Sequence, residues 1–78
     1  MKAQRPITNR RLYAGCLAGQ LPAELLSTAD RERLVRVLHA RGWSDVEIAV
    51  HTSMTTYTAA RIRARLVLLP NDVQKGAA

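Results

Sequence analysis

The chain has 78 residues, enough for one small domain but too few for a catalytic barrel or a doubly wound α/β sheet. Hydrophobic residues make up 47% and charged residues 23%, a balance typical of a folded domain rather than a disordered chain. Twelve basic and six acidic residues give a net charge of +6. Such a charge attracts polyanions, nucleic acid first and an anionic membrane second.

Ten of the twelve basic residues are arginine, which has two explanations. Arginine is preferred where a forked donor meets phosphate or a guanine edge. It is also favoured by a GC-rich genome, which would indicate a bacterium or its phage. The charge excess lies at the two ends, with +4 over residues 1–11 and +3 over residues 55–78. We expect a basic flexible arm over 1–8, a helical domain over 9–70 and a frayed tail over 71–78.

The residue inventory favours a cytoplasmic protein that is not an enzyme. No apolar run approaches 18 residues, and no apolar stretch of a secretory signal follows the basic N-terminus. Cys16 is the single cysteine, which fits a reducing compartment. His39 and His51, the latter expected to be exposed, have no partner at metal-ligand spacing. We expect no metal, no cofactor and no small-molecule substrate, because nucleophile–base pairs, paired carboxylates and Gly-rich loops are missing.

Apolar spacing is helical throughout, and the first helix is predicted over residues 9 to about 19. Thr8 is its candidate cap, and Gly19 and Pro22 end it. One face carries Leu12, Tyr13, Cys16 and Leu17. This face either covers the core or forms a dimer surface.

The next two helices have the clearest start signals. Ser27 with Asp30 caps a helix over 29–41, which Gly42 ends. Ser44 and Glu47 form a capping box for a short helix over 45–52. Trp43 and Ile48 then have the spacing of a hydrophobic staple around that start.

A last helix begins after a cap at Thr55 or Thr56. Its predicted core stripe is Ala59, Ile62, Leu66 and Leu69. Pro70 stops it, and no strand pattern follows, so we expect no wing. The fold class is therefore all-α: a trihelical bundle with an extra N-terminal helix.

A short capped helix, a tight turn and a longer basic helix resemble a bacterial homeodomain-like helix-turn-helix over residues 43–66. Ile48-Ala49 matches the apolar-Ala pair of that family, and residues 53–55 match its turn. Two residues depart from the pattern. Ser53 stands where glycine is usual, and Thr52 stands where leucine is usual. We expect a distorted turn or slightly different helix packing there.

The resemblance implies that the outward face of the last helix contacts DNA. Thr55 and Thr56 lie at its start, and Arg63 and Arg65 lie at the flanks, facing phosphates. The central positions are Tyr57, Ala60, Arg61 and Ala64. Arg5, Arg10 and Arg11 of the basic N-terminal region lie along the backbone or in a minor groove. The alternatives are a solvated basic helix face, a Tyr57 packed on a neighbouring helix, and a disordered solubilising tail.

The expected function is sequence-specific binding of double-stranded DNA by a transcriptional regulator of bacterial or phage origin. A homodimer is possible, because one short helix contacts only a few base pairs. The alternative is a small protein-interaction module, an adaptor or an inhibitor of a host polymerase or replication factor. RNA binding ranks lower, because only three residues are aromatic.

Overall fold

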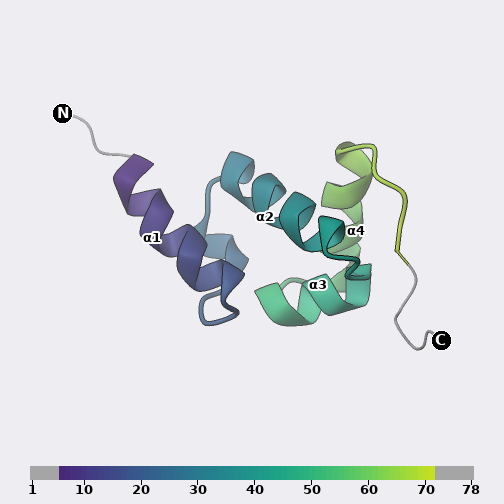
Figure 1. Cartoon of the computed structure of the whole chain (residues 1–78), viewed down its shortest axis with the longest axis horizontal. Helices are drawn as coiled ribbons and strands as arrows, with labels where there is room; N and C mark the ends of the chain where they lie inside the picture. Colours follow the sequence, from purple (N-terminus) through teal and green to yellow (C-terminus); the bar gives the residue numbers. More distant parts are fainter. Residues whose placement is uncertain (1–5, 72–78) are drawn as a thin grey trace.

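The computed structural model describes the backbone of residues 6–71 and the side chains of residues 10–71. Within that range the protein is all-helical, without strands, which confirms the predicted all-α class. The elements are α1 (Pro6–Leu17), the 3₁₀ turn η1 (Ala23–Leu25), α2 (Thr28–Ala40), α3 (Asp45–Thr52) and α4 (Thr56–Arg65). Figure 1 shows α1 at one end of the long axis, α4 at the other, and α2 between them.

One aliphatic core joins all the elements. Its buried members are Cys16, Ala23, Leu26, Leu34, Val35, Leu38, Ile48, Ala49, Ala59 and Ile62. Leu12, Tyr13 and Leu17 are partly buried against it, so the predicted apolar face of α1 covers the core. The scarcity of aromatic residues is therefore matched by a core of small and branched aliphatic side chains.

The N-terminal boundary differs from the prediction. α1 begins at Pro6, three residues before the expected start, and residues 6–8 belong to the helix rather than to a flexible arm. Proline suits the first helical position, because its fixed φ is helical and its missing N–H has no partner there anyway. The arm residues 1–5, Arg5 included, lie outside the described residues.

All four α-helices end in the same way. A residue with positive φ follows each: Gly19 (81°), Gly42 (90°), Ser53 (60°) and Val67 (60°). The next amide then bonds a carbonyl five residues back, as in Gln20 to Gly15, Trp43 to Leu38, Met54 to Ala49 and Leu68 to Arg63. These are Schellman closures, which satisfy the last carbonyls of each helix.

The predicted caps of α2, α3 and α4 are confirmed. The Ser27 hydroxyl accepts from the Asp30 amide at 3.2 Å. Ser44 and Glu47 make the reciprocal bonds of the capping box, at 3.2 and 2.7 Å. For α4 the cap is Thr55, whose hydroxyl accepts from the Thr58 amide at 3.0 Å.

The predicted end of α4 is wrong. The helix stops at Arg65, and Leu69, assigned to the core stripe, is 84% exposed. The turn at Val67 carries the chain away from the helix axis before Pro70 is reached. Beyond the turn the chain is held by side chains: the Arg63 Nη1 donates to the Leu68 carbonyl at 2.8 Å, and His39 Nε2 lies 2.6 Å from the Leu69 carbonyl.

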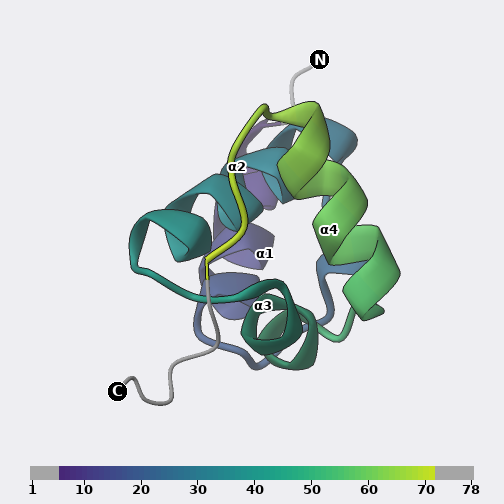
Figure 2. The same ribbon diagram turned by 90° about the vertical axis from the view of Figure 1, so that its right-hand side faces the viewer.

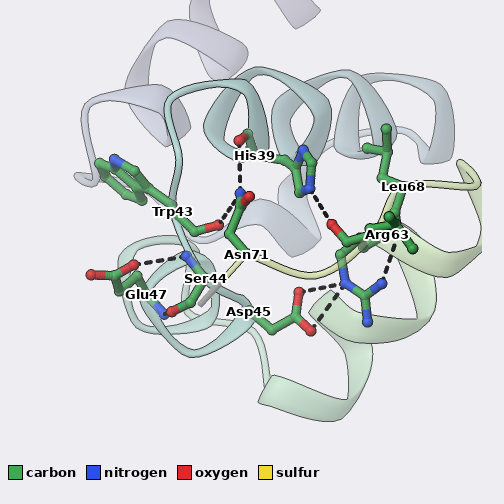
Figure 3. A network of polar contacts seen from close by, with 9 residues as sticks. His39, Trp43, Ser44, Asp45, Glu47, Arg63, Leu68 and Asn71 are labelled. Carbon is green, nitrogen blue, oxygen red and sulfur yellow. Dashed lines mark hydrogen bonds and ion pairs between the residues drawn. The ribbon is translucent and has the colours of Figure 1, made fainter. Parts of the chain in front are cut away.

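The last described residue, Asn71, is also held by the domain. Asn71, assigned to the frayed tail over 71–78, donates from Nδ2 to the carbonyls of His39 and Trp43, at 2.9 and 3.0 Å. Figure 3 shows how this amide closes the corner between α2 and α3. Residues 72–78 lie outside the described residues.

Candidate nucleic-acid interface

Residues 53–55 connect α3 to α4 in a tight corner. Ser53 adopts the positive φ that glycine would supply, and Thr52 is fully buried in place of an aliphatic side chain. The Thr52 hydroxyl donates to the Ile48 carbonyl at 2.7 Å, so its burial leaves no donor unpaired. Figure 2 looks nearly along α3 while α4 is seen from the side, so the two helices cross steeply.

Two alanines allow the close crossing. Ala49 of α3 is 3% exposed, and Ala59 of α4 is fully buried. Small side chains let the backbones approach, and Ile48 and Ile62 fill the space beside them in the core. Both residues of the apolar-Ala pair at 48–49 are therefore buried in the core.

An ion pair fixes the orientation of α4 on α3. The Arg63 Nε lies 2.8 and 3.1 Å from the two carboxylate oxygens of Asp45, the first residue of α3. Only 14% of the Arg63 side chain and 17% of the Asp45 side chain are exposed. Figure 3 shows the guanidinium turned toward α3 and the Leu68 carbonyl. Arg63 was expected to contact phosphate, but the structure uses its guanidinium inside the protein.

Arg65 lies in a more open ion pair. Its Nε is 3.1 Å from a carboxylate oxygen of Glu32 on α2, and 52% of the Arg65 side chain remains exposed. Pairs as exposed as this contribute little to stability. Arg65 can therefore exchange Glu32 for another anion at small cost, which is compatible with its predicted place at the flank.

The outward face of α4 presents the predicted residues to solvent. Tyr57 is 72% exposed, and the Arg61 guanidinium carbon lies 5.8 Å from the centre of its ring. Arg61 and Ala64 are exposed, and Ala60 is half-buried. The alternative in which Tyr57 packs on a neighbouring helix is wrong. A guanidinium stacked on an aromatic ring loses less freedom when it binds, because its plane is already oriented.

The two threonines at the start of α4 are not equivalent. Thr55 is occupied, because its hydroxyl accepts from the Thr58 amide and donates to the Thr58 hydroxyl at 2.9 Å. Thr56 is exposed in the first turn. Thr56 is therefore the one whose hydroxyl is placed to contact an incoming anion.

The two described residues of the basic N-terminal set lie far from this face. Arg10 and Arg11 are exposed on α1. Since α1 and α4 stand at opposite ends of the long axis (Figure 1), they do not extend from the α4 face as an arm beside a recognition helix would.

The histidines and the cysteine serve the scaffold. His51, expected to be exposed, is half-buried: its Nε2 lies 2.7 Å from the Leu17 carbonyl, and its ring meets that of Trp43 edge-on. Burial raises the pKa of the Cys16 thiol, which makes it a poor nucleophile at neutral pH. Among the described residues, no His, Cys, Asp and Glu side chains gather in a group able to hold a metal ion.

Sequence reasoning missed an apolar surface on α3. Trp43, Val46, Glu47, Val50 and His51 line an open groove of about 400 Å³. Val46 and Val50 are 49% and 78% exposed. Their spacing of four, on the side of α3 away from Ile48 and Ala49, was the available signal.

None of the helices over the described residues has the length and apolar character needed to cross a membrane. Comparison with protein-family models, with curated proteins and with solved structures found no match to this chain.

Proposed function

We propose that residues 43–66 form a helix-turn-helix and that the protein binds double-stranded DNA sequence-specifically, with α4 in the major groove. The observation that carries this proposal is the exposed pair of Tyr57 and Arg61 on a helix whose other arginines are held in ion pairs. A solvated surface helix does not need its orientation fixed by a largely buried ion pair. A helix that must present one guanidinium at a defined place does.

The chemistry of the α4 face suits a groove floor. The Arg61 guanidinium can donate two hydrogen bonds to O6 and N7 of a guanine. Ala60 and Ala64 leave room for the helix to approach the bases, and a methyl side chain can contact a thymine methyl group. Thr56, in the first turn, is placed to donate to a phosphate.

The proposal extends to the biological setting. We propose a cytoplasmic transcriptional regulator of bacterial or phage origin that acts as a homodimer. A single α4 contacts a few base pairs, and pairing two copies on a palindrome would multiply the recognised length.

Selection of bound duplexes from a random pool, followed by titration of the selected sequence, tests the proposal. Arg61→Ala should weaken binding by about 1–3 kcal/mol and relax the preference at one base position. Arg65→Ala is the matched control on the same helix, and it should lower affinity evenly across sequences. An Arg61→Ala protein that selects the same sequence with unchanged affinity would remove α4 from the groove.

The second candidate function is a protein-interaction module, an adaptor or inhibitor of a host polymerase or replication factor. The α3 groove with the exposed Val46 and Val50 favours it. A gel shift with random duplex DNA at two salt concentrations separates the two functions, because an adaptor would retain no DNA at either.

A further inference from the structure

The unpaired positive charge lies mainly outside α4. Residues 6–41 hold six arginines and three acidic residues, whereas residues 42–71 hold three arginines and two acidic residues. The two ion pairs among the described side chains occupy Arg63 and Arg65. Among the described residues, Arg61 is therefore the arginine of α4 whose guanidinium is in no ion pair. The Arg31 guanidinium is occupied by the carbonyls of Ala23 and Leu26, at 3.3 and 2.8 Å.

The remaining exposed arginines of the described residues are Arg10, Arg11, Arg33, Arg36 and Arg41, which lie on α1, on α2 and at the C-terminal end of α2. Arg10 and Tyr13 are three apart on α1, so they share a helix face. Tyr13 connects the two helices. Burial raises the pKa of its hydroxyl; the nearby charges of Arg33 and Arg41 oppose that rise, and the charge of Asp30 adds to it. We call Arg10, Arg33 and Arg41 the α1–α2 basic surface; all three are exposed, and Asp30 is the acidic residue that lies near Tyr13 beside them.

This surface faces away from the α4 site. Glu32, which contacts Arg65 of α4, marks the side of α2 that is turned toward α4. At about 100° per residue, positions 41 and 33 lie about 180° and about 100° from position 32, so Arg41 and Arg33 point away from that side. Position 36 lies only about 40° from position 32, and Arg36 is therefore not part of this surface. Figure 1 shows α1 at the far end of the molecule from α4. A duplex that occupies the α4 face therefore leaves the α1–α2 basic surface open.

The surface has the chemistry of a phosphate contact. The large apolar side chains that are exposed among residues 10–71 are Leu25, Val46, Val50, Tyr57, Val67 and Leu69, and all lie outside α1 and α2. A membrane-surface helix needs such side chains to enter the lipid, and a protein interface needs them as anchors. Guanidinium groups without apolar anchors suit a sugar–phosphate backbone, which is bound by charge and hydrogen bonds.

We propose that the α1–α2 basic surface binds the phosphate backbone of a second DNA segment, so that one chain bridges two duplexes. The proposal rests on the proposed function only for the first segment, which α4 holds. The second contact is independent of sequence, because phosphates carry no sequence information.

A capture assay tests the bridge. One duplex is fixed to beads, protein is added, and retention of a separate fluorescent duplex is measured. We expect the wild type to capture it and the Arg10→Ala/Arg33→Ala/Arg41→Ala protein to lose at least about tenfold of the captured signal. The affinity for the second duplex should fall as the salt concentration rises from about 50 to about 200 mM. Loss of three phosphate contacts should make that fall smaller by a factor of about 40. The matched triple lysine variant should still capture, since lysine also binds phosphate.

The outcomes separate this inference from the proposed function. Capture lost in the triple alanine variant, with the selected sequence unchanged, supports the bridge. Capture unchanged in that variant overturns it, and would indicate that a homodimer presents two α4 helices. The inference is also overturned if the wild type captures no duplex but binds phosphatidylserine vesicles, and the triple variant loses that binding. If Arg61→Ala leaves sequence preference intact while the triple variant loses capture, the α4 proposal fails and the bridge stands.

Discussion

The ion pair between Asp45 and Arg63 is the contact whose loss should disturb α3 and α4 most. Asp45→Asn keeps the shape of the side chain but removes the charge that faces the Arg63 guanidinium at 2.8 Å. The guanidinium stays in place, because its Nη1 still donates to the Leu68 carbonyl. The variant therefore leaves a mostly buried cation without its anion.

The burial of the two side chains sets the magnitude. Breaking a fully buried pair by removing one partner costs about 3–5 kcal/mol, and exposed pairs contribute about 0–1 kcal/mol. With side-chain exposures of 14% and 17%, this pair lies nearer the buried limit, and we expect a loss of about 2–3 kcal/mol. For a chain of this size that corresponds to a fall in melting temperature of about 10–20 °C.

Thermal unfolding followed by circular dichroism measures the loss, with Glu32→Gln as the matched control. That substitution breaks the other ion pair of α4, in which 52% of Arg65 and 29% of Glu32 are exposed, and should cost less than about 1 kcal/mol. A double-mutant cycle with Arg63→Met isolates the coupling from the helix-start effect of Asp45. Equal losses in Asp45→Asn and Glu32→Gln would refute the reasoning from burial.

Three further predictions concern local strain, capping and pH. Val67→Gly should stabilise the fold by about 0.5–1 kcal/mol, because it relieves a β-branched residue at φ 60°. The control is Val50→Gly in α3, also at an exposed site, which should destabilise the fold by about 0.5 kcal/mol. If Val67→Gly melts below Val50→Gly, the backbone at Val67 is not strained. Ser44→Ala should cost about 1 kcal/mol through loss of the capping box, and a melting temperature equal to that of the wild type would contradict this. Burial raises the pKa of Cys16 and of Tyr13 above their ordinary values of 9.0 and 10.0. The unfolded chain ionises first, so the stability contributed by these groups is intact below pH 9.0 and is lost as the pH rises through the raised pKa values. Urea unfolding at a series of pH values should show this fall in the free energy of unfolding, and the fall should be smaller in Cys16→Ala.

Elements specified by neighbouring residues could be predicted from the sequence. The capping box of Ser44 and Glu47 fixed the start of α3 correctly, and Gly42 marked the end of α2, because both signals act within one turn of the chain. The outward face of α4 followed from helical period alone, since Ala59 and Ile62 are buried and Arg61 is exposed.

Features that depend on distant partners could not be predicted in this way. The apolar spacing of Leu66 and Leu69 predicted a longer α4, but the turn at Val67 is secured by contacts across the fold. His39, thirty residues away in sequence, holds the Leu69 carbonyl, and Asn71 bonds carbonyls on either side of the α2–α3 corner. The role of Arg63 was hidden for the same reason, because it depends on where α3 places Asp45.

The same dependence changes what net charge means for the proposed function. Along the sequence, residues 55–78 carry an excess charge of +3 and residues 29–54 are neutral, which favours the last helix as the DNA contact. In the fold, Asp45 and Glu32 neutralise two arginines of α4. Under our proposals, α4 recognises bases mainly through Arg61, while the salt-dependent binding of a second duplex comes from the α1–α2 basic surface. Substitutions in that surface should therefore reduce capture of a second duplex and leave the selected sequence unchanged, which a protein that binds DNA through α4 alone would not show.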